Sequence, residues 1–299
     1  MLPDARRRVP STFIGLSARD GVANRMDEGL LELQGNRIQY RQQDGGGRSV
    51  VFIHGWASSS RMWLRELGAF GGQYRCLALD LPGHGLSTKP PLPWYSLDGF
   101  VSLTYEFIHA LRAEPACLVG HSLGGSIALD YALRYPDDVN ALVLVNPVIT
   151  GQLQLNLRWL YRPGPSRVIV NLTRRLWPRL ATHLQQSLAA NRLRLVPKGP
   201  LRRNLEDLTQ ATADSLLGTA RAAHNDLSSR LDAVRVPTLV LVGRRDRTVP
   251  PEDGRLAARR IPGARLVELP TDHHPGDEAP EAFVQALRGF LGQPLSRPA

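Results

Sequence analysis

The chain has 299 residues, of which 42% are hydrophobic and 21% are charged, and this composition is typical of a folded globular protein. Two cysteines are too few for a disulfide scaffold, and no apolar run reaches the roughly 18 residues of a membrane-spanning helix. No apolar stretch of the secretory-signal type follows the early arginines, so we expect a cytoplasmic protein.

The net charge of +10 is unevenly distributed. Residues 151–204 contain eleven basic side chains and no Asp or Glu. They are Arg158, Arg162, Arg167, Arg174, Arg175, Arg179, Arg192, Arg194, Lys198, Arg202 and Arg203. A local field of this sign attracts anionic partners such as a membrane surface or an acidic acyl-carrier protein. The alternative is that the arginines only keep the surface soluble.

Alternating runs predict strands and helices from residue 30 onward. An irregular lead-in precedes residues 30–43, whose alternation predicts a hairpin with Gly35 and Asn36 at its turn. Short apolar runs predict buried strands at 49–53, 75–80, 116–119, 141–145, 238–242 and 264–269. Helix-length segments lie at 61–70, 96–112, 123–135, 255–260 and 280–291. This order predicts a parallel sheet with helices on both faces.

The strand–helix alternation stops between residues 149 and 234. Apolar residues from Ile169 to Leu188 recur every three or four positions, an amphipathic helical pattern that Pro178 interrupts. We therefore expect an N-terminal extension (1–28), a core formed by 29–148 and 235–299, and an Arg-rich helical cap formed by 149–234.

The strongest chemical signal is Gly-His-Ser-Leu-Gly at residues 120–124. It follows a predicted strand and precedes a predicted helix, as a nucleophile elbow requires. The sharp turn exposes the Ser122 hydroxyl, and the glycines allow the strand and the helix to pack closely. A serine hydroxyl needs a base to accept its proton.

The base and its carboxylate partner are expected after the serine, in the order Ser, acid, His. Asp246 follows a predicted strand, and His273 and His274 follow the next one, so all lie at the carboxyl edge of the sheet. Asp246 has an alternative role as partner of a neighbouring arginine. Asp272 is a second carboxylate that either tunes the imidazole or faces water.

Acyl transfer also needs donors for the developing oxyanion. We expect the backbone N–H of Leu123, directly after the nucleophile, and that of Trp56, in the loop after strand 49–53. The indole of Trp56 would then line the acyl pocket.

These motifs resemble the α/β-hydrolase superfamily, in its branch with a helical cap. The matching segments are 54–56 (His-Gly-Trp), 80–87 (Asp-Leu-Pro-Gly-His-Gly-Leu-Ser), 120–125, and Asp246 followed by His273. The resemblance implies a mostly parallel eight-stranded sheet flanked by helices, with a cap inserted after the sixth strand. The register of Pro275, Glu278 and Pro280-Glu281 selects His273 over His274. Asp272 departs from the glycine that is usual there.

No metal or cofactor motif is present: the histidines lie in separate loops, and no phosphate-binding glycine motif follows a strand. No nucleic-acid-binding module is recognised either. Cys76 and Cys117 lie in predicted strands that flank a third in the family's strand order, about 10 Å apart at two inter-strand spacings, so we expect two free buried thiols.

The leading hypothesis is a serine hydrolase that cleaves a small carboxylic ester through Ser122, Asp246 and His273. Cap residues between Leu153 and Leu184 would form an apolar slot for a medium-length acyl chain or an aryl ester. The alternatives are a C–C bond or lactone hydrolase, a hydrolase of esters delivered by an acyl-carrier protein or an anionic membrane, and a slow-turnover binding protein.

Overall fold

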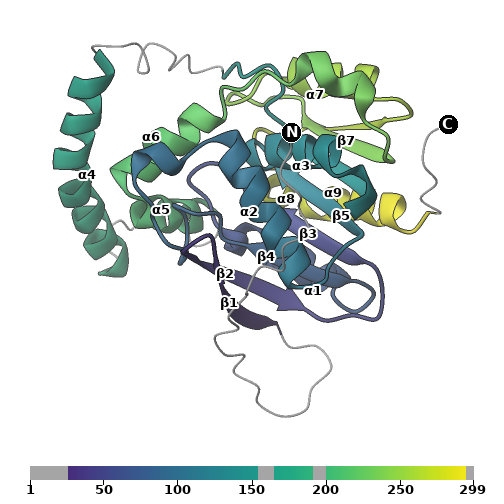
Figure 1. Ribbon diagram of the computed structural model, residues 1–299, viewed down its shortest axis with the longest axis horizontal. Helices are drawn as coiled ribbons and strands as arrows, with labels where there is room; N and C mark the ends of the chain where they lie inside the picture. The colour runs from purple at the N-terminus through teal and green to yellow at the C-terminus, as the bar shows by residue number, and fades with distance from the viewer. Residues whose placement is uncertain (1–25, 154–164, 191–199, 294–299) are drawn as a thin grey trace, which may run out of the picture.

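The computed structural model describes residues 26–153, 165–190 and 200–293. It contains one eight-stranded sheet in the order β1-β2-β4-β3-β5-β6-β7-β8 (Figure 1). The strands are β1 (Asp27–Leu33), β2 (Asn36–Gln43), β3 (Ser49–Ile53), β4 (Arg75–Leu79), β5 (Ala116–His121), β6 (Val139–Val145), β7 (Thr238–Gly243) and β8 (Arg265–Leu269). The first two pairings in this order are antiparallel and the others are parallel, as the resemblance implied.

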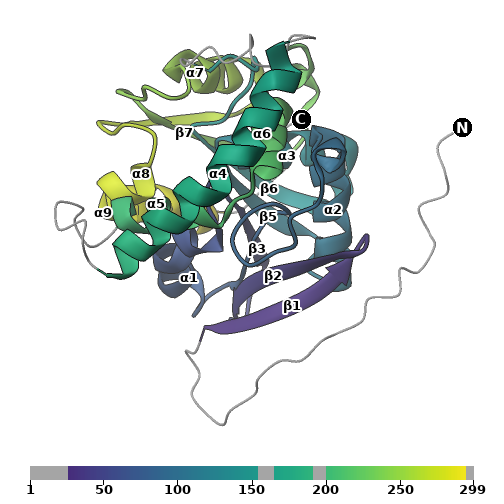
Figure 2. The same ribbon diagram turned by 90° about the vertical axis from the view of Figure 1, so that its left-hand side faces the viewer.

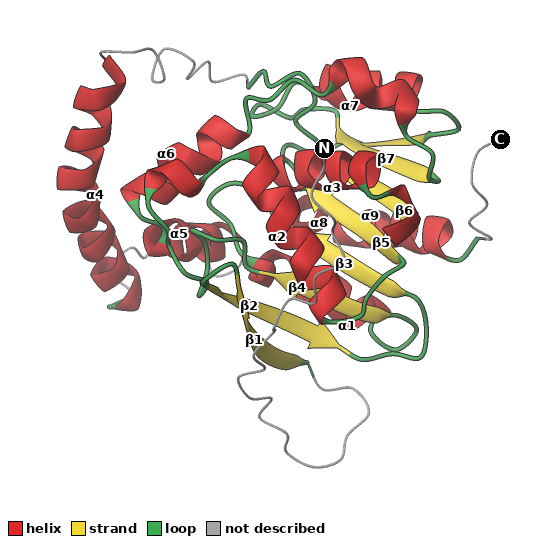
Figure 3. Cartoon of the chain, in the orientation of Figure 1, coloured by secondary structure: helices red, strands yellow, loops and turns green. Residues whose placement is uncertain are grey.

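Helices cover both faces of the sheet (Figure 3). One core cluster joins the sheet to α2 (Leu97–Ala110), α3 (Leu123–Arg134) and α7 (Pro251–Arg260). The opposite cluster joins it to α1 (Leu64–Phe70) and α9 (Pro280–Leu291), with the short α8 (Pro275–Glu278) before α9. The expected parallel sheet between two helical layers is therefore confirmed. Because parallel strands are buried on both faces, they read as continuous apolar runs in the sequence.

The described part of the chain between β6 and β7 includes three further α-helices: α4 (Pro165–Ala189), α5 (Pro200–Gln210) and α6 (Ala213–Ala222). We call them the cap helices. In Figure 2, α4 faces the viewer and crosses in front of α5 and α6, on which it packs. None of the described helices is both long and apolar enough to cross a membrane. The exact division between core and cap stays a prediction.

Pro178 does not interrupt α4, contrary to the expectation from sequence. Proline removes one backbone hydrogen bond. The helix nevertheless continues, because Trp177 on one side of the proline and Ala181 and Leu188 on the other all pack against the neighbouring helices or loops. Tertiary packing here outweighs the local preference.

The hairpin turn differs from the prediction by one residue. Gln34 and Gly35 have φ values of 50° and 70° and form the turn, whereas Asn36 is the first residue of β2. The Asn36 side chain donates to the Gln34 carbonyl, which holds the turn from its flank. Strand β1 begins at Asp27, within the expected extension 1–28, whose first 25 residues lie outside the described part.

Candidate active site

Ser122 occupies the turn between β5 and α3. Its φ of 54° and ψ of −118° are unusual for a residue with a side chain, and such a conformation costs about 1–3 kcal/mol. The Ser122 backbone N–H donates to the Val145 carbonyl at the end of β6. Surrounding structure therefore holds the strained conformation that the sequence motif predicted.

The flanking glycines are required by close packing. A Cβ on Gly120 would lie 2.2 Å from the Gly124 carbonyl oxygen, and one on Gly124 would lie 2.2 Å from the Ile53 carbonyl oxygen. Both distances are shorter than any real contact. Only glycine at both positions lets β3, β5 and α3 meet at this turn.

Asp246 and His273 are brought together from two loops at the carboxyl edge of the sheet. His273 Nδ1 lies 2.7 Å from Asp246 Oδ2, and both residues are buried. The other carboxylate oxygen, Asp246 Oδ1, accepts the backbone N–H groups of Thr248 and Val249 at 2.8 and 3.0 Å. The loop thus fixes the carboxylate so that it faces the imidazole.

Asp272, the departure from the family pattern, is bound by Arg247. Its carboxylate accepts from the backbone and the guanidinium of Arg247, whose side chain is largely exposed. The Glu278 carboxylate accepts the backbone N–H groups of Asp272 and His274 at 2.8 and 3.2 Å. Asp272 and Glu278 therefore anchor the two ends of the loop that carries His273.

His274 lies beside His273, with ring centroids 5.3 Å apart. Burial, followed by the neighbouring His273, lowers the pKa of His274 to about 4. His274 is therefore uncharged at neutral pH. The 2.7 Å contact to the Asp246 carboxylate is made by His273.

Two residues that the sequence reasoning missed hold the backbone of His273. Asn146 Nδ2 and His121 Nε2 lie 3.0 and 2.7 Å from the His273 carbonyl oxygen. Asn146 also accepts the Gly243 backbone N–H at 2.7 Å, so it links the ends of β6 and β7 to the histidine loop. The signal in the sequence was a polar residue at the carboxyl end of each of two buried strands: His121 ends β5, and Asn146 directly follows β6.

The loop after β3 lies against the nucleophile. A Cβ on Gly55 would lie 3.0 Å from Ser122 Cβ, so the glycine permits the approach. Asp80, at the end of β4, holds the turns at Ser60 and Leu86 by accepting their backbone N–H groups at 2.7 and 2.9 Å.

Trp56 connects this loop to the cap. Its indole Nε1 donates to the Leu216 carbonyl on α6 at 2.9 Å, and the side chain remains 46% exposed. Leu123 is the first residue of α3, a position whose N–H has no acceptor within the helix.

Ser122 and His273 border a cavity of about 330 Å³ between the core and the cap helices. Apolar side chains dominate its lining: Trp56, Leu123, Val148, Leu153, Leu201, Leu205, Leu208, Ala220 and Ala223. Three of the leucines come from α5, which the sequence analysis had not singled out. Within the segment from Leu153 to Leu184, which was expected to form the slot, Leu153 is the one described residue that borders this cavity, and residues 154–164 lie outside the described part.

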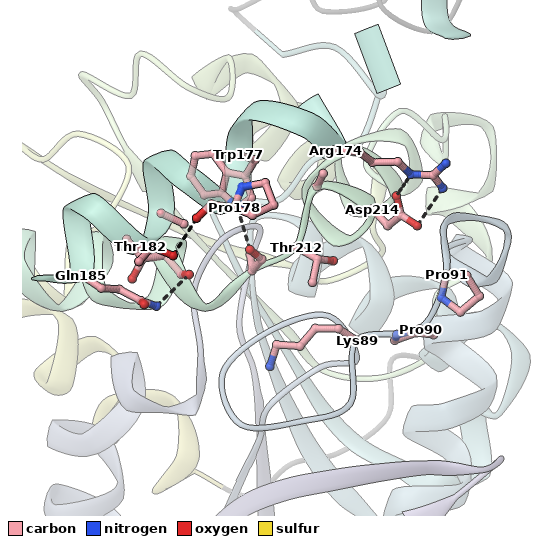
Figure 4. Close-up of a pocket in the computed structure, with 14 residues that line it drawn as sticks. Lys89, Pro90, Pro91, Arg174, Trp177, Pro178, Thr182, Gln185, Thr212 and Asp214 are labelled. Atoms are coloured by element: carbon pink, nitrogen blue, oxygen red, sulfur yellow. Dashed lines mark hydrogen bonds and ion pairs between the residues drawn. The ribbon is translucent and has the colours of Figure 1, made fainter. Parts of the chain in front are cut away.

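A second cavity, of about 600 Å³, lies under α4 and is more open (Figure 4). Among the described residues that line it there is no serine and no histidine. Several of its polar side chains already have partners: Arg174 pairs with Asp214, Trp177 donates to the Ala211 carbonyl, and Gln185 donates to the Thr209 carbonyl.

The chain belongs to the α/β hydrolase fold family, whose model matches residues 48–280. The fold and the Ser122 turn thus define a hydrolase of this family.

Similar proteins include several hydrolases. The pimeloyl-[acyl-carrier protein] methyl ester esterase of Neisseria meningitidis is 28% identical over 84% of this chain and 79% of its own length. The monoacylglycerol lipase ABHD6 of Bos taurus is 25% identical over 84% of this chain and 77% of its own length. The crystal structure of a hydrolase from Pseudomonas aeruginosa has a TM-score of 0.70 and 28% identity, and covers 89% of this chain and 98% of that one.

Proposed function

We propose that this protein is a serine hydrolase that cleaves carboxylic esters through an acyl-enzyme. The 2.7 Å contact between His273 Nδ1 and Asp246 Oδ2, beside the cavity that Ser122 borders, is the observation that carries the proposal. A carboxylate at Nδ1 favours the tautomer with its proton there, which leaves Nε2 as the base.

In the proposed reaction, Ser122 Oγ attacks the acyl carbon while His273 Nε2 takes its proton. The backbone N–H groups of Leu123 and Trp56 would stabilise the oxyanion. His273 then protonates the leaving alcohol, and the same residue activates the water that hydrolyses the acyl-enzyme. Asp246 orients the imidazole and stabilises the imidazolium that forms.

The cavity supports a substrate of moderate size. A volume of about 330 Å³ is near the lower end of ordinary ligand sites, and its lining is mostly aliphatic. A medium-length acyl chain or an aryl ester fits these properties better than a highly polar substrate.

Initial rates on p-nitrophenyl esters from acetate to palmitate test this function. We expect a chain-length optimum, and we expect Ser122→Ala to lower kcat by roughly 10³-fold or more. Ser102→Ala, on the exposed face of α2, is the matched control. Near-normal turnover by Ser122→Ala would exclude the mechanism. If only a lactone or a diketone were turned over, the substrate class would be that compound and not an open-chain ester.

We further propose that α4 docks on an anionic lipid surface that supplies the ester. Leu172, Leu176 and Leu180 are 52%, 50% and 57% exposed, and their spacing of four residues forms one stripe on the helix. Arg175 and Arg179 each follow a stripe leucine by three residues and therefore adjoin it. No ion pair of either arginine occurs among the described residues.

Charge alone does not explain this surface. Arg174, Arg202 and Arg203 pair with Asp214, Glu206 and Asp277, so part of the basic charge noted in the sequence is offset within the fold. Exposed leucines flanked by unpaired arginines are typical of a helix that lies at a lipid–water interface. Attraction between the arginines and an acidic protein surface would not by itself bury the exposed leucines.

Vesicle flotation tests the docking. The protein should float with phosphatidylglycerol vesicles and much less with phosphatidylcholine vesicles. Leu172→Ser/Leu176→Ser/Leu180→Ser should abolish flotation, whereas Leu64→Ser/Leu266→Ser, which alters exposed leucines outside the cap, should not. Salt-sensitive binding of an acyl-carrier protein that the leucine substitutions leave unchanged would instead identify that partner.

A further inference from the structure

A small enclosed cavity adjoins the Ser122 site. Its volume is about 10 Å³, close to the minimum that holds one water molecule. It is lined by Met62, Trp63, Glu66, His121, Val145, His274, Pro275, Gly276, Asp277 and Phe283. His121 and His274 also border the larger cavity.

Four of these residues carry a buried polar atom that has no hydrogen-bond partner among the described residues: Trp63 Nε1, Glu66 Oε2, His121 Nδ1 and His274 Nδ1. Trp63, Glu66 and His121 are at most 2% exposed. Each buried polar atom without a hydrogen bond lowers the stability of the fold by about 1–3 kcal/mol. Four such atoms around one cavity therefore indicate a shared hydrogen-bond partner.

The hydrogen bond made by His121 Nε2 determines whether Nδ1 is a donor or an acceptor. Nε2 lies 2.7 Å from the His273 carbonyl oxygen, which can only accept, so Nε2 carries the proton. Burial, then the neighbouring His273 and His274, hold the pKa of His121 well below its usual value. Its ring is therefore neutral, and Nδ1 is an acceptor that needs a donor.

The carboxyl group of Glu66 favours its protonated, uncharged form more than an exposed glutamate does. Burial raises the pKa of its carboxyl to about 7; Asp277 acts in the same direction, while Arg65 and Arg203 oppose it. The protonated carboxyl can donate as well as accept. Trp63 only donates.

One water molecule matches this set. It can accept from Trp63, donate to His121 Nδ1, and exchange hydrogen bonds with Glu66 and His274. A metal ion is a poorer candidate, because no three metal-ligating side chains among the described residues are placed to share one. An apolar group would leave all four atoms unsatisfied.

We propose that Trp63, Glu66, His121 and His274 form an enclosed site for one water molecule, which keeps His121 in the tautomer that donates to the His273 carbonyl. Glu66 is then a positioning residue for His273. This last role rests on the proposed function, whereas the water site and the His121 tautomer do not.

The test combines a structure with a spectroscopic measurement on the full chain. A high-resolution crystal structure should contain an ordered water within hydrogen-bond distance of at least three of the four atoms. In protein labelled with ¹⁵N in its eight histidines, long-range ¹H–¹⁵N correlation should show His121 as the neutral Nε2–H tautomer from pH 6 to 8. Direct contact of Glu66 with His121 or His274, or a His121 that is charged at pH 7, would overturn the proposal.

Variants of Glu66 separate positioning from packing. Glu66→Gln keeps hydrogen bonding and should preserve the His121 tautomer and kcat within about twofold. Glu66→Leu should mix the tautomers and lower kcat by roughly tenfold with an unchanged KM. Trp63→Phe, which removes the indole N–H together with part of a buried ring, gives a second measurement if Glu66→Leu does not fold. An unchanged tautomer in both variants would contradict the proposal, even if the enzyme proved to act on another substrate.

Discussion

The side-chain amide of Asn146 donates a 3.0 Å hydrogen bond to the backbone carbonyl of His273, and its oxygen accepts the Gly243 N–H at 2.7 Å. One buried side chain thus spans the ends of β6, β7 and the loop after β8. We expect Asn146→Ala to lower the free energy of unfolding by about 2–4 kcal/mol, because the buried Gly243 N–H loses its acceptor and the carbonyls of Asp272 and His273 each lose the amide donor. Urea unfolding would measure this.

The same substitution should reduce kcat more than it raises KM, since Asn146 positions His273 and does not border the substrate cavity. Ser102→Ala is a suitable control for handling and expression. An Asn146→Ala variant that is destabilised but keeps the kcat of the parent would show that Asn146 only supports the fold.

Asp246 and Asp272 offer a matched pair of carboxylates. Asp246→Asn would place an amide opposite His273 Nδ1 and disfavour the tautomer that leaves Nε2 as base, so we expect kcat to fall by roughly 10⁴-fold. Asp272→Asn loses mainly the ion pair with the exposed Arg247, which is worth at most about 1 kcal/mol. Its kcat should stay within about threefold of the parent. Equal losses in both variants would contradict the assignment of Asp246.

Glu66 gives a prediction for stability against pH. Its pKa rises from 4.5 in the unfolded chain to about 7 in the folded protein, so between these values the folded state binds more protons. The free energy of unfolding should therefore fall by about 3 kcal/mol from pH 4.5 to pH 7. Glu66→Gln should lack this component. Urea unfolding at pH 5, 6 and 7 would compare the two, and parallel pH curves would refute the prediction.

Cys76 and Cys117 are free and buried, as expected, and both pair with Val50 across β3. Burial raises the pKa of each thiol to about 12. Both should react very slowly with a disulfide reagent in the native protein, because the thiolate is the reactive form. Two equivalents should titrate in denaturant. Rapid reaction of either thiol without denaturant would show that its strand opens.

The sequence by itself determined the sheet, because parallel strands buried on both faces leave continuous apolar runs that only end where the chain turns. It also determined the positions of Ser122, Asp246 and His273, since the strand–turn–helix context and the order of loops at one sheet edge are local or topological properties. Their catalytic roles stay a proposal, as does the division of core and cap.

Only the tertiary structure decided which residues hold the site together. Asn146, His121 and Glu66 are far from His273 along the chain. His121 lies within the motif at 120–124, but neither that motif nor any periodicity shows that its partner is the His273 carbonyl. The same holds for α4, which passes through Pro178 because burial on α5 and α6 compensates for the lost backbone hydrogen bond. The sequence predicted that its leucines contribute to the apolar slot, but Leu172, Leu176 and Leu180 are exposed, and leucines of α5 line the cavity instead.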